Sequence, residues 1–126
     1  MILVDTSVWI EFFKGKEPYS FQLVNLMENQ NIIVNELVFA ELIQGAKGKR
    51  ERDVLMRYWE ALPHAEKENL YVDSALFSSK KKHIDKGVGL VDSVLVHVVK
   101  TMNVKLWTLD KKLSRLLAPN ELFDCI

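Results

Sequence analysis

"MILVDTSVWI" (residues 1–10) joins an apolar run to a carboxylate and two hydroxyl groups. Residues 1–4 are apolar throughout, which is typical of a short strand covered on both faces of a parallel sheet. The run stops at Asp5, and in open α/β sheets ligands bind at the carboxyl ends of the strands. The stretch therefore predicts a parallel sheet with a functional carboxylate at the tip of its first strand.

Two further short runs, residues 31–35 and 104–108, are rich in β-branched or aromatic residues and predict strands. The "ALPH" stretch (residues 61–64) allows one more, which Pro63 limits. Helical spacing of apolar residues is found over residues 21–27, 37–46, 54–62, about 66–86 and 90–99. This alternation predicts an α/β fold, with helices on both faces of the sheet and right-handed crossovers.

The length of 126 residues predicts a single domain covering residues 1–126. No apolar stretch approaches the ~20 residues of a membrane span, and no basic region precedes the first apolar run. We therefore expect a cytoplasmic protein. The lone Cys125 excludes an internal disulfide and a cysteine-based zinc site.

Four carboxylates occupy unusual positions. Asp5 and Asp110 follow predicted strands, where each has an alternative role as a helix cap or turn former. Glu41 lies in the apolar helix "LVFAELIQGA" (residues 37–46), so we expect its carboxylate to be at least half buried. Asp92 opens another apolar helix, where the helix dipole offers an alternative explanation.

No basic residue is placed in the sequence to neutralise these four acids, and an unpaired buried charge costs several kcal/mol. Mg²⁺ or Mn²⁺ would neutralise them, because both ions prefer carboxylate oxygens. Zinc is less expected, since the three histidines (His64, His83 and His97) do not pair at short spacing. We expect His97 to be packed or hydrogen-bonded rather than a metal ligand.

The stretches "ILVDTSVWIEF", "NELVFAELIQGAK", "GLVDSVLVHVV" and "LWTLDKKLSRL", in this order, resemble the PIN-domain ribonucleases and most closely the VapC toxins. The resemblance covers nearly the whole chain and implies a three-layer α/β/α sandwich with a central parallel sheet. The family's motif residues correspond to Asp5 with Thr6 and Ser7, Glu41 with Gly45, Asp92, and Thr108 with Asp110.

The chain also departs from the family pattern. Many relatives carry a further acid and an aromatic residue where Lys112 and Leu113 stand, so a fifth acidic ligand is missing. Ser93 and His97 occupy positions where small apolar residues are more usual. These differences leave open whether one metal ion binds or two.

The resemblance implies a Mg²⁺- or Mn²⁺-dependent endoribonuclease that is the toxin of a type II toxin–antitoxin system. Asp5 and Asp92 would hold the metal, and Glu41 and Asp110 would complete the acidic pocket. We assign Ser7 and Thr108 to orienting a carboxylate or a metal-bound water. Capping and strand-end hydrogen bonding are equally good roles for these two hydroxyls.

Seventeen basic and seventeen acidic residues give no net charge, so contacts with RNA must be local. One basic cluster follows Asp110 and another follows the Glu41 helix. The alternative role for each cluster is that of a solvated helix end or loop. The candidate RNA-binding residues are Lys111, Lys112, Arg115, Lys47, Lys49 and Arg50. Binding through few phosphates favours a selected, structured RNA.

After Asp5, the stretch "TSVWIEFF" (residues 6–13) is apolar on more than one side of the predicted helix. We expect some of Trp9, Phe12 and Phe13 to stay outside the core and anchor a protein partner. The alternative is that the helix at residues 21–27 covers them. The resemblance implies a small VapB-type antitoxin as partner, and a homodimer formed through another apolar face.

Three other functions compete with that of a ribonuclease. A phosphate-accepting receiver domain needs adjacent acids after its first strand, but Thr6 follows Asp5. The four intact acids argue against a catalytically inactive PIN-like binding module. A metal-dependent nuclease that cleaves DNA differs only in substrate, and it stays open as an alternative.

Overall fold

The computed structural model describes residues 1–124 and contains three short parallel strands, β1 (Ile2–Val4), β2 (Ile32–Ile33) and β3 (Lys105–Trp107). The strand order is β2-β1-β3, with Leu3 opposite Ile33 on one side and Leu106 on the other. All three residues of β1 are buried, as expected for the central strand of a covered sheet. The predicted parallel sheet is thus confirmed.

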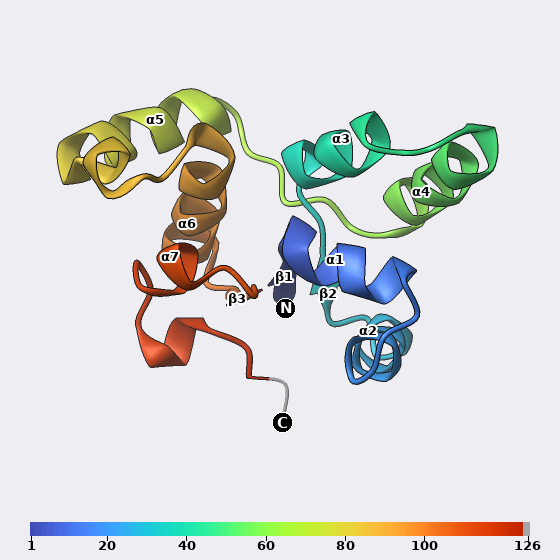
Figure 1. Cartoon of the computed structure of the whole chain (residues 1–126). Coiled ribbons are helices and arrows are strands. Elements are labelled where there is room, and N and C mark those ends of the chain that lie inside the picture. The colour runs from blue at the N-terminus through green and yellow to red at the C-terminus, as the bar shows by residue number, and fades with distance from the viewer. Residues whose placement is uncertain (125–126) are drawn as a thin grey trace.

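Helices surround these strands. They are α1 (Thr6–Phe13), α2 (Tyr19–Glu28), α3 (Glu36–Gln44), α4 (Lys49–Ala61), α5 (Leu70–Lys81), α6 (Leu90–Met102) and α7 (Lys111–Ser114), with 3₁₀ turns η1 (His83–Lys86) and η2 (Pro119–Glu121). In Figure 1, α1 to α4 lie on one side of the strands and α5 to α7 on the other. This arrangement confirms the expected three-layer α/β/α sandwich.

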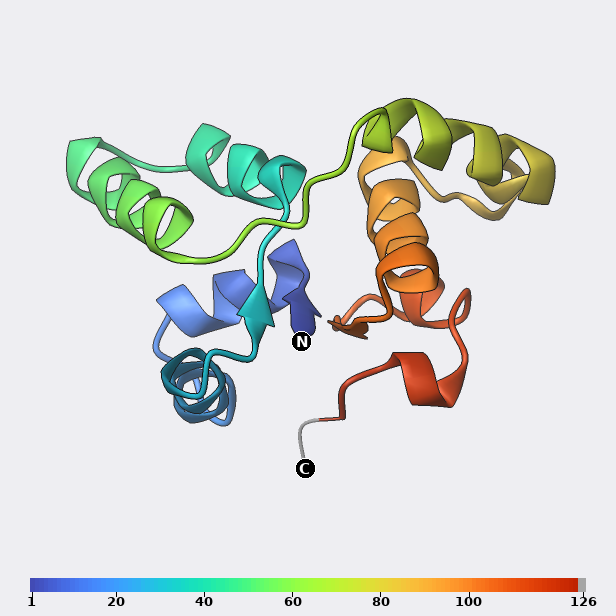
Figure 2. The same cartoon turned by 180° about the vertical axis from the view of Figure 1, so that it is seen from behind.

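The order of the strands places the carboxyl end of β1 between two sets of helices. The chain leaves β1 for β2 on one side and returns through α6 to β3 on the other side. Figure 2 shows the connection between α4 and α5 crossing from one half of the molecule to the other. In such sheets the helices diverge at the central strand, and ligands bind at its carboxyl end. Asp5 stands at that end.

Local sequence explains how strands turn into helices here. Asp5 and Asn35 are extended residues that follow β1 and β2, and their side chains accept hydrogen bonds from the first amides of α1 and α3. Below them, Leu3, Val4 and Leu106 of the sheet are inaccessible to solvent. The two caps therefore begin both helices directly above the buried sheet.

Two predicted elements differ from the observed ones. The helix expected over residues 66–86 is α5 alone, followed by η1, because Lys82 adopts a left-handed backbone conformation (φ 54°) and ends the helix. Glycine or asparagine usually marks such an end, so a lysine gave no signal. The possible strand at residues 61–64 is a single bridge between His64 and Val34.

Cys125 lies outside the described residues. Within residues 1–124, no helix has the length and apolar composition needed to cross a membrane.

Candidate active site

Asp5 is the most constrained acid of the site. Its carboxylate is buried, and Oδ1 accepts a hydrogen bond from the Thr6 amide at 2.8 Å. Oδ2 accepts one from Ser7 Oγ at 2.8 Å and one from Thr108 Oγ1 at 2.7 Å. Three donors from two segments hold this carboxylate in one orientation, so both hydroxyls lie where an orienting role requires them.

The same hydroxyls anchor the segment that follows β3. Ser7 Oγ accepts a hydrogen bond from the Leu109 amide, and Thr108 Oγ1 accepts one from the Asp110 amide, both at 3.0 Å. Asp110 then caps α7, because its Oδ1 accepts hydrogen bonds from the first amides of that helix. Within residues 1–124, no hydrogen bond uses Asp110 Oδ2. Asp110 therefore caps α7 through Oδ1, and its Oδ2 remains available for a ligand.

Glu41 is exposed, and the expectation that it is half buried is wrong. In α3 only Val38 and Phe39 are fully buried, while Glu36, Ala40 and Glu41 face solvent. The helix therefore has a polar face that the run of apolar letters concealed. Thr6 Oγ1 donates a hydrogen bond to Glu41 Oε1 at 3.0 Å and ties this helix to the start of α1. Sequence reasoning assigned no role to Thr6, although its hydroxyl directly follows Asp5.

Asp92 lies in the first turn of α6 and is half buried. Burial first, and then the negative charges of Asp5, Asp110 and Glu41, together raise the pKa of this carboxyl from 3.8 to about 6. The four acids, which come from distant parts of the chain, are therefore electrostatic neighbours. Within residues 1–124, none of the four forms an ion pair with lysine, arginine or histidine.

These carboxylates suit a divalent cation in charge and in donor type. Hard oxygen ligands and uncompensated negative charge are what Mg²⁺ and Mn²⁺ need. In the described part of the chain, however, no three or more His, Cys, Asp or Glu side chains stand close enough together to hold an ion. The fit to a cation is thus one of chemistry and charge.

The raised pKa of Asp92 makes a prediction for the metal-free protein. The folded-state pKa of about 6 lies above the ordinary 3.8, so this group stabilises the fold below about pH 4 and loses that contribution as the pH rises through 6. In the presence of a chelator, the free energy of unfolding of Asp92→Asn should increase relative to that of the wild type as the pH rises from 5 to 7.5. The expected increase is on the order of 1 kcal/mol, after allowance for solvent screening.

Thermal melts at the two pH values, with and without Mg²⁺, measure this difference. Mg²⁺ should raise the wild-type midpoint more than that of Asp92→Asn. An unchanged difference in stability between the two proteins at pH 5 and 7.5 would contradict the raised pKa of Asp92.

The basic candidates separate into two groups. Lys111, Lys112 and Arg115 are exposed on and just after α7, which begins at Asp110. Lys47, Lys49 and Arg50 are exposed at the start of α4. Lys49 pairs with Asp53 at 3.0 Å, whereas Lys47 and Arg50 line an apolar groove beside α1. Of the two groups, only the one on α7 directly follows a carboxylate of the site, Asp110, along the chain.

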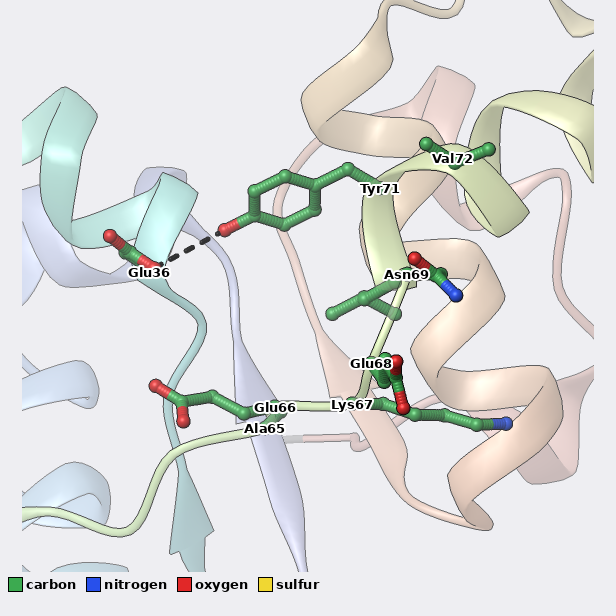
Figure 3. A pocket seen from close by; sticks show the side chains of 9 residues that line it. Glu36, Ala65, Glu66, Lys67, Glu68, Asn69, Tyr71 and Val72 are labelled. Carbon is green, nitrogen blue, oxygen red and sulfur yellow. Dashed lines mark hydrogen bonds between the residues drawn. The ribbon is translucent and has the colours of Figure 1, made fainter.

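A pocket of about 690 Å³ lies between the start of α3 and the start of α5. Figure 3 shows Tyr71 pointing from α5 toward Glu36, to which its hydroxyl donates a weak hydrogen bond at 3.5 Å. Burial and the charges of Glu36 and Glu66 raise the pKa of Tyr71. Three glutamates and one lysine line this pocket, a balance that repels phosphate, so we place no RNA contact here.

The aromatic residues of α1 are not equivalent, and Trp9 must be removed from the candidate interface. Its side chain is fully buried, and its ring packs against Phe39 at 5.2 Å between centroids. Phe12 is partly buried, while Phe13 is 38% exposed. Phe13 lines the groove between α1, α3 and α4 together with Ile10. The expectation that some of these aromatic side chains stay outside the core therefore fits Phe13, whereas Trp9 packs against Phe39 of α3.

His97 packs against Phe77 at 5.7 Å between ring centroids, as expected of a packed histidine. His64 stacks on Trp59, and its Nε2 lies 2.7 Å from the Trp59 carbonyl oxygen.

Comparisons with known proteins agree with this fold. The family model described as "PIN domain" matches residues 2–117. Ribonuclease VapC32 of Mycobacterium tuberculosis is 31% identical over an alignment of 119 residues that covers 90% of this chain and 88% of that protein.

Two solved structures share the fold at low identity. VapBC2 from Rickettsia felis, bound to a DNA fragment from its promoter, superposes with a TM-score of 0.68 at 20% identity and 98% coverage of both chains. A toxin–antitoxin complex from Klebsiella pneumoniae gives 0.67 at 16% identity and 90% coverage of both chains.

Proposed function

This chain belongs to the PIN-domain family, in its VapC branch, and from that premise we propose that it is a metal-dependent endoribonuclease, the toxin of a type II toxin–antitoxin pair. The observation that carries the proposal is the group of four mutually repelling carboxylates without a cationic partner in the described residues. The relative named as a ribonuclease supports the substrate class.

In this proposal Asp5 and Asp92 hold Mg²⁺ or Mn²⁺, and Glu41 and Asp110 complete the acidic pocket. A bound ion supplies a water of lowered pKa and balances negative charge on the phosphate in the transition state. Ser7 and Thr108 keep the Asp5 carboxylate oriented through the hydrogen bonds to Oδ2. Thr6 holds Glu41 toward the same edge of the sheet.

The RNA would approach across α7. Lys111 and Lys112 are exposed beside Asp110, so their ammonium groups can meet phosphates that the acids repel. Because the chain has no net charge, few phosphates contribute to binding. We propose that the shape of a folded RNA supplies the remaining selectivity. A single PIN domain acting in the cytoplasm suits this role.

The proposal is tested by incubating the purified, partner-free protein with total RNA in Mg²⁺, Mn²⁺ or EDTA. Discrete fragments should form with either metal and none should form in EDTA, because the acids alone cannot activate water. Single- and double-stranded DNA in parallel reactions test the alternative substrate. Intact RNA under all conditions, from a protein shown to be folded, would overturn the nuclease proposal.

We propose that a VapB-type antitoxin docks in the groove between α1, α3 and α4, a pocket of about 550 Å³. Ile10, Phe13 and Leu42 give this groove apolar walls. Its charged lining is three basic residues and one acid: Lys14, Lys47, Arg50 and Glu51. A partner segment with apolar anchors and acidic neighbours fits that lining. Similarity to structures of toxin–antitoxin complexes supports the choice of partner.

Phe13→Ala should weaken binding of the gene product encoded beside this one by about tenfold, the effect of losing an aromatic anchor of 1 to 2 kcal/mol. Titration calorimetry measures it, and growth arrest on expression of the toxin should then be relieved less well by co-expression. Phe21→Ala is the matched control, because Phe21 is 68% exposed on α2, away from the groove. Equal affinities for wild type and Phe13→Ala would place the interface elsewhere.

We also propose a homodimer that forms through a different apolar face. Val72, Leu76, Ile84 and Leu90 are all more than half exposed on α5, η1 and the start of α6. Light scattering of the partner-free protein measures the oligomeric state.

A further inference from the structure

A second charged pocket, of about 470 Å³, lies where the end of α5, η1, α6 and the turn after α7 meet. These elements lie together in one half of the molecule in Figure 1. The polar side chains that line the pocket are all basic: Lys81, His83, Lys86, Lys100 and Arg115. No acidic side chain of residues 1–124 lines it. A concave site of one charge sign concentrates ions of the opposite sign.

Most of this positive charge is uncompensated. Lys100 pairs with Glu121 at 2.7 Å, but Lys81, Lys86 and Arg115 have no carboxylate partner within the described residues. Surface lysines usually point apart into water, whereas these cations surround one hollow. An anion in the pocket would relieve their mutual repulsion.

His83 provides an independent indication of a ligand. It is only 5% exposed, and its Nδ1 is buried without a hydrogen-bond partner. Burial first, and then the charges of Lys86 and Lys81, hold the pKa of this imidazole below its ordinary value. An unpartnered buried polar atom is costly, and His83 lines this pocket, so an anion held there would stabilise the protonated ring and offset part of the cost of its burial.

The pocket shares α6 with the acids and lies next to the end of α7. Asp92 lies in the first turn of α6, and Val96 and Lys100 of the pocket lie about one and two turns further along. Asp110 caps α7, and Arg115 directly follows that helix. An RNA strand that runs past the four acids and along α7 would therefore reach this basic pocket.

We propose that this pocket binds a phosphate group of the RNA backbone that flanks the scissile bond. The inference rests on the proposed ribonuclease function and adds a contact for its substrate outside the acidic cleft. The planar guanidinium of Arg115 suits two phosphate oxygens, and Lys81 and Lys86 supply point charges. The pocket would fix the position of the RNA relative to the acids without taking part in the cleavage step.

The test measures binding to fluorescein-labelled bulk tRNA in EDTA, where metal-dependent cleavage does not occur. We expect about tenfold weaker tRNA binding for the double variant Lys81→Ala/Lys86→Ala and for Arg115→Ala. In each, the slope of log affinity against log salt concentration should fall by roughly the amount of one phosphate contact. Lys16→Ala/Lys67→Ala is the matched control, because it removes the same charge from exposed positions outside the pocket. This control should change the affinity less than twofold.

A second measurement follows the ring signals of His83 by NMR with inorganic phosphate, against chloride at equal ionic strength. Phosphate should raise the pKa of His83 because a nearby anion favours the protonated ring. A response to phosphate without weaker tRNA binding by the variants would make this a site for free anions and overturn the RNA contact. Equal responses to phosphate and chloride, or equal losses in the control variant, would overturn the site itself.

The results that would refute the pocket differ from the results that would refute the proposed nuclease. A wild type that cleaves no RNA with either metal would refute the nuclease, whatever the pocket variants show. Wild-type cleavage with unchanged tRNA affinity in the variants would refute only the pocket.

Discussion

Asp5→Asn is expected to lower RNA cleavage by at least about 1,000-fold, the equivalent of roughly 4 kcal/mol of transition-state stabilisation. The substitution keeps the shape of the side chain and removes its charge, so one of the two proposed metal ligands becomes a weak one. Ser7 Oγ and Thr108 Oγ1 can turn to accept hydrogen bonds from the new amide, which should preserve the fold.

Initial rates in Mn²⁺, together with thermal melts of both proteins, measure this effect. Thr108→Val is the graded control, since it removes one orienting hydrogen bond and leaves the charge, and should cost only about 10- to 100-fold. Wild-type cleavage by folded Asp5→Asn would show that the acid at the tip of β1 is a helix cap and nothing more.

Trp9→Ala should destabilise the protein by about 3 to 5 kcal/mol, the range found when large buried aromatic side chains are truncated. The Trp9 ring is inaccessible to solvent and packs edge-on against Phe39 and Tyr58, so its loss leaves a cavity beneath α1. Urea unfolding followed by circular dichroism measures the change in the free energy of unfolding.

Phe21→Ala again serves as the control and should cost less than about 0.5 kcal/mol, because most of its side chain is in water. If Trp9→Ala is as stable as wild type and loses only partner binding, Trp9 belongs to the interface after all and the packing described for α1 is wrong.

The sequence predicted those features that depend on local pattern. The apolar run before Asp5, and the similar runs before Asn35 and Thr108, each gave a strand of the sheet. Carboxylates at strand ends and in apolar helices indicated a common site, because parallel strands end at the same edge. The structure brings the charges of Asp5, Glu41 and Asp110 close enough to raise the pKa of Asp92.

Features that depend on contacts between distant segments were not predictable. The burial of Trp9 depends on α3, which begins more than 20 residues later, and the exposure of Glu41 depends on which face of that helix meets α1. The basic pocket brings Lys81 and Arg115 together with residues of η1 and α6. In the sequence these residues belong to two separate charge clusters, each of which resembles a solvated helix end.

Direct titration of Mn²⁺ into the metal-free protein, followed by calorimetry, tests the central claim most closely. The wild type should bind one or two ions, and Asp5→Asn and Asp92→Asn should each bind Mn²⁺ at least about tenfold more weakly, since each loses a charged ligand. No binding by the wild type at millimolar Mn²⁺, or equal affinity in all three proteins, would contradict the assignment of these acids as a metal centre.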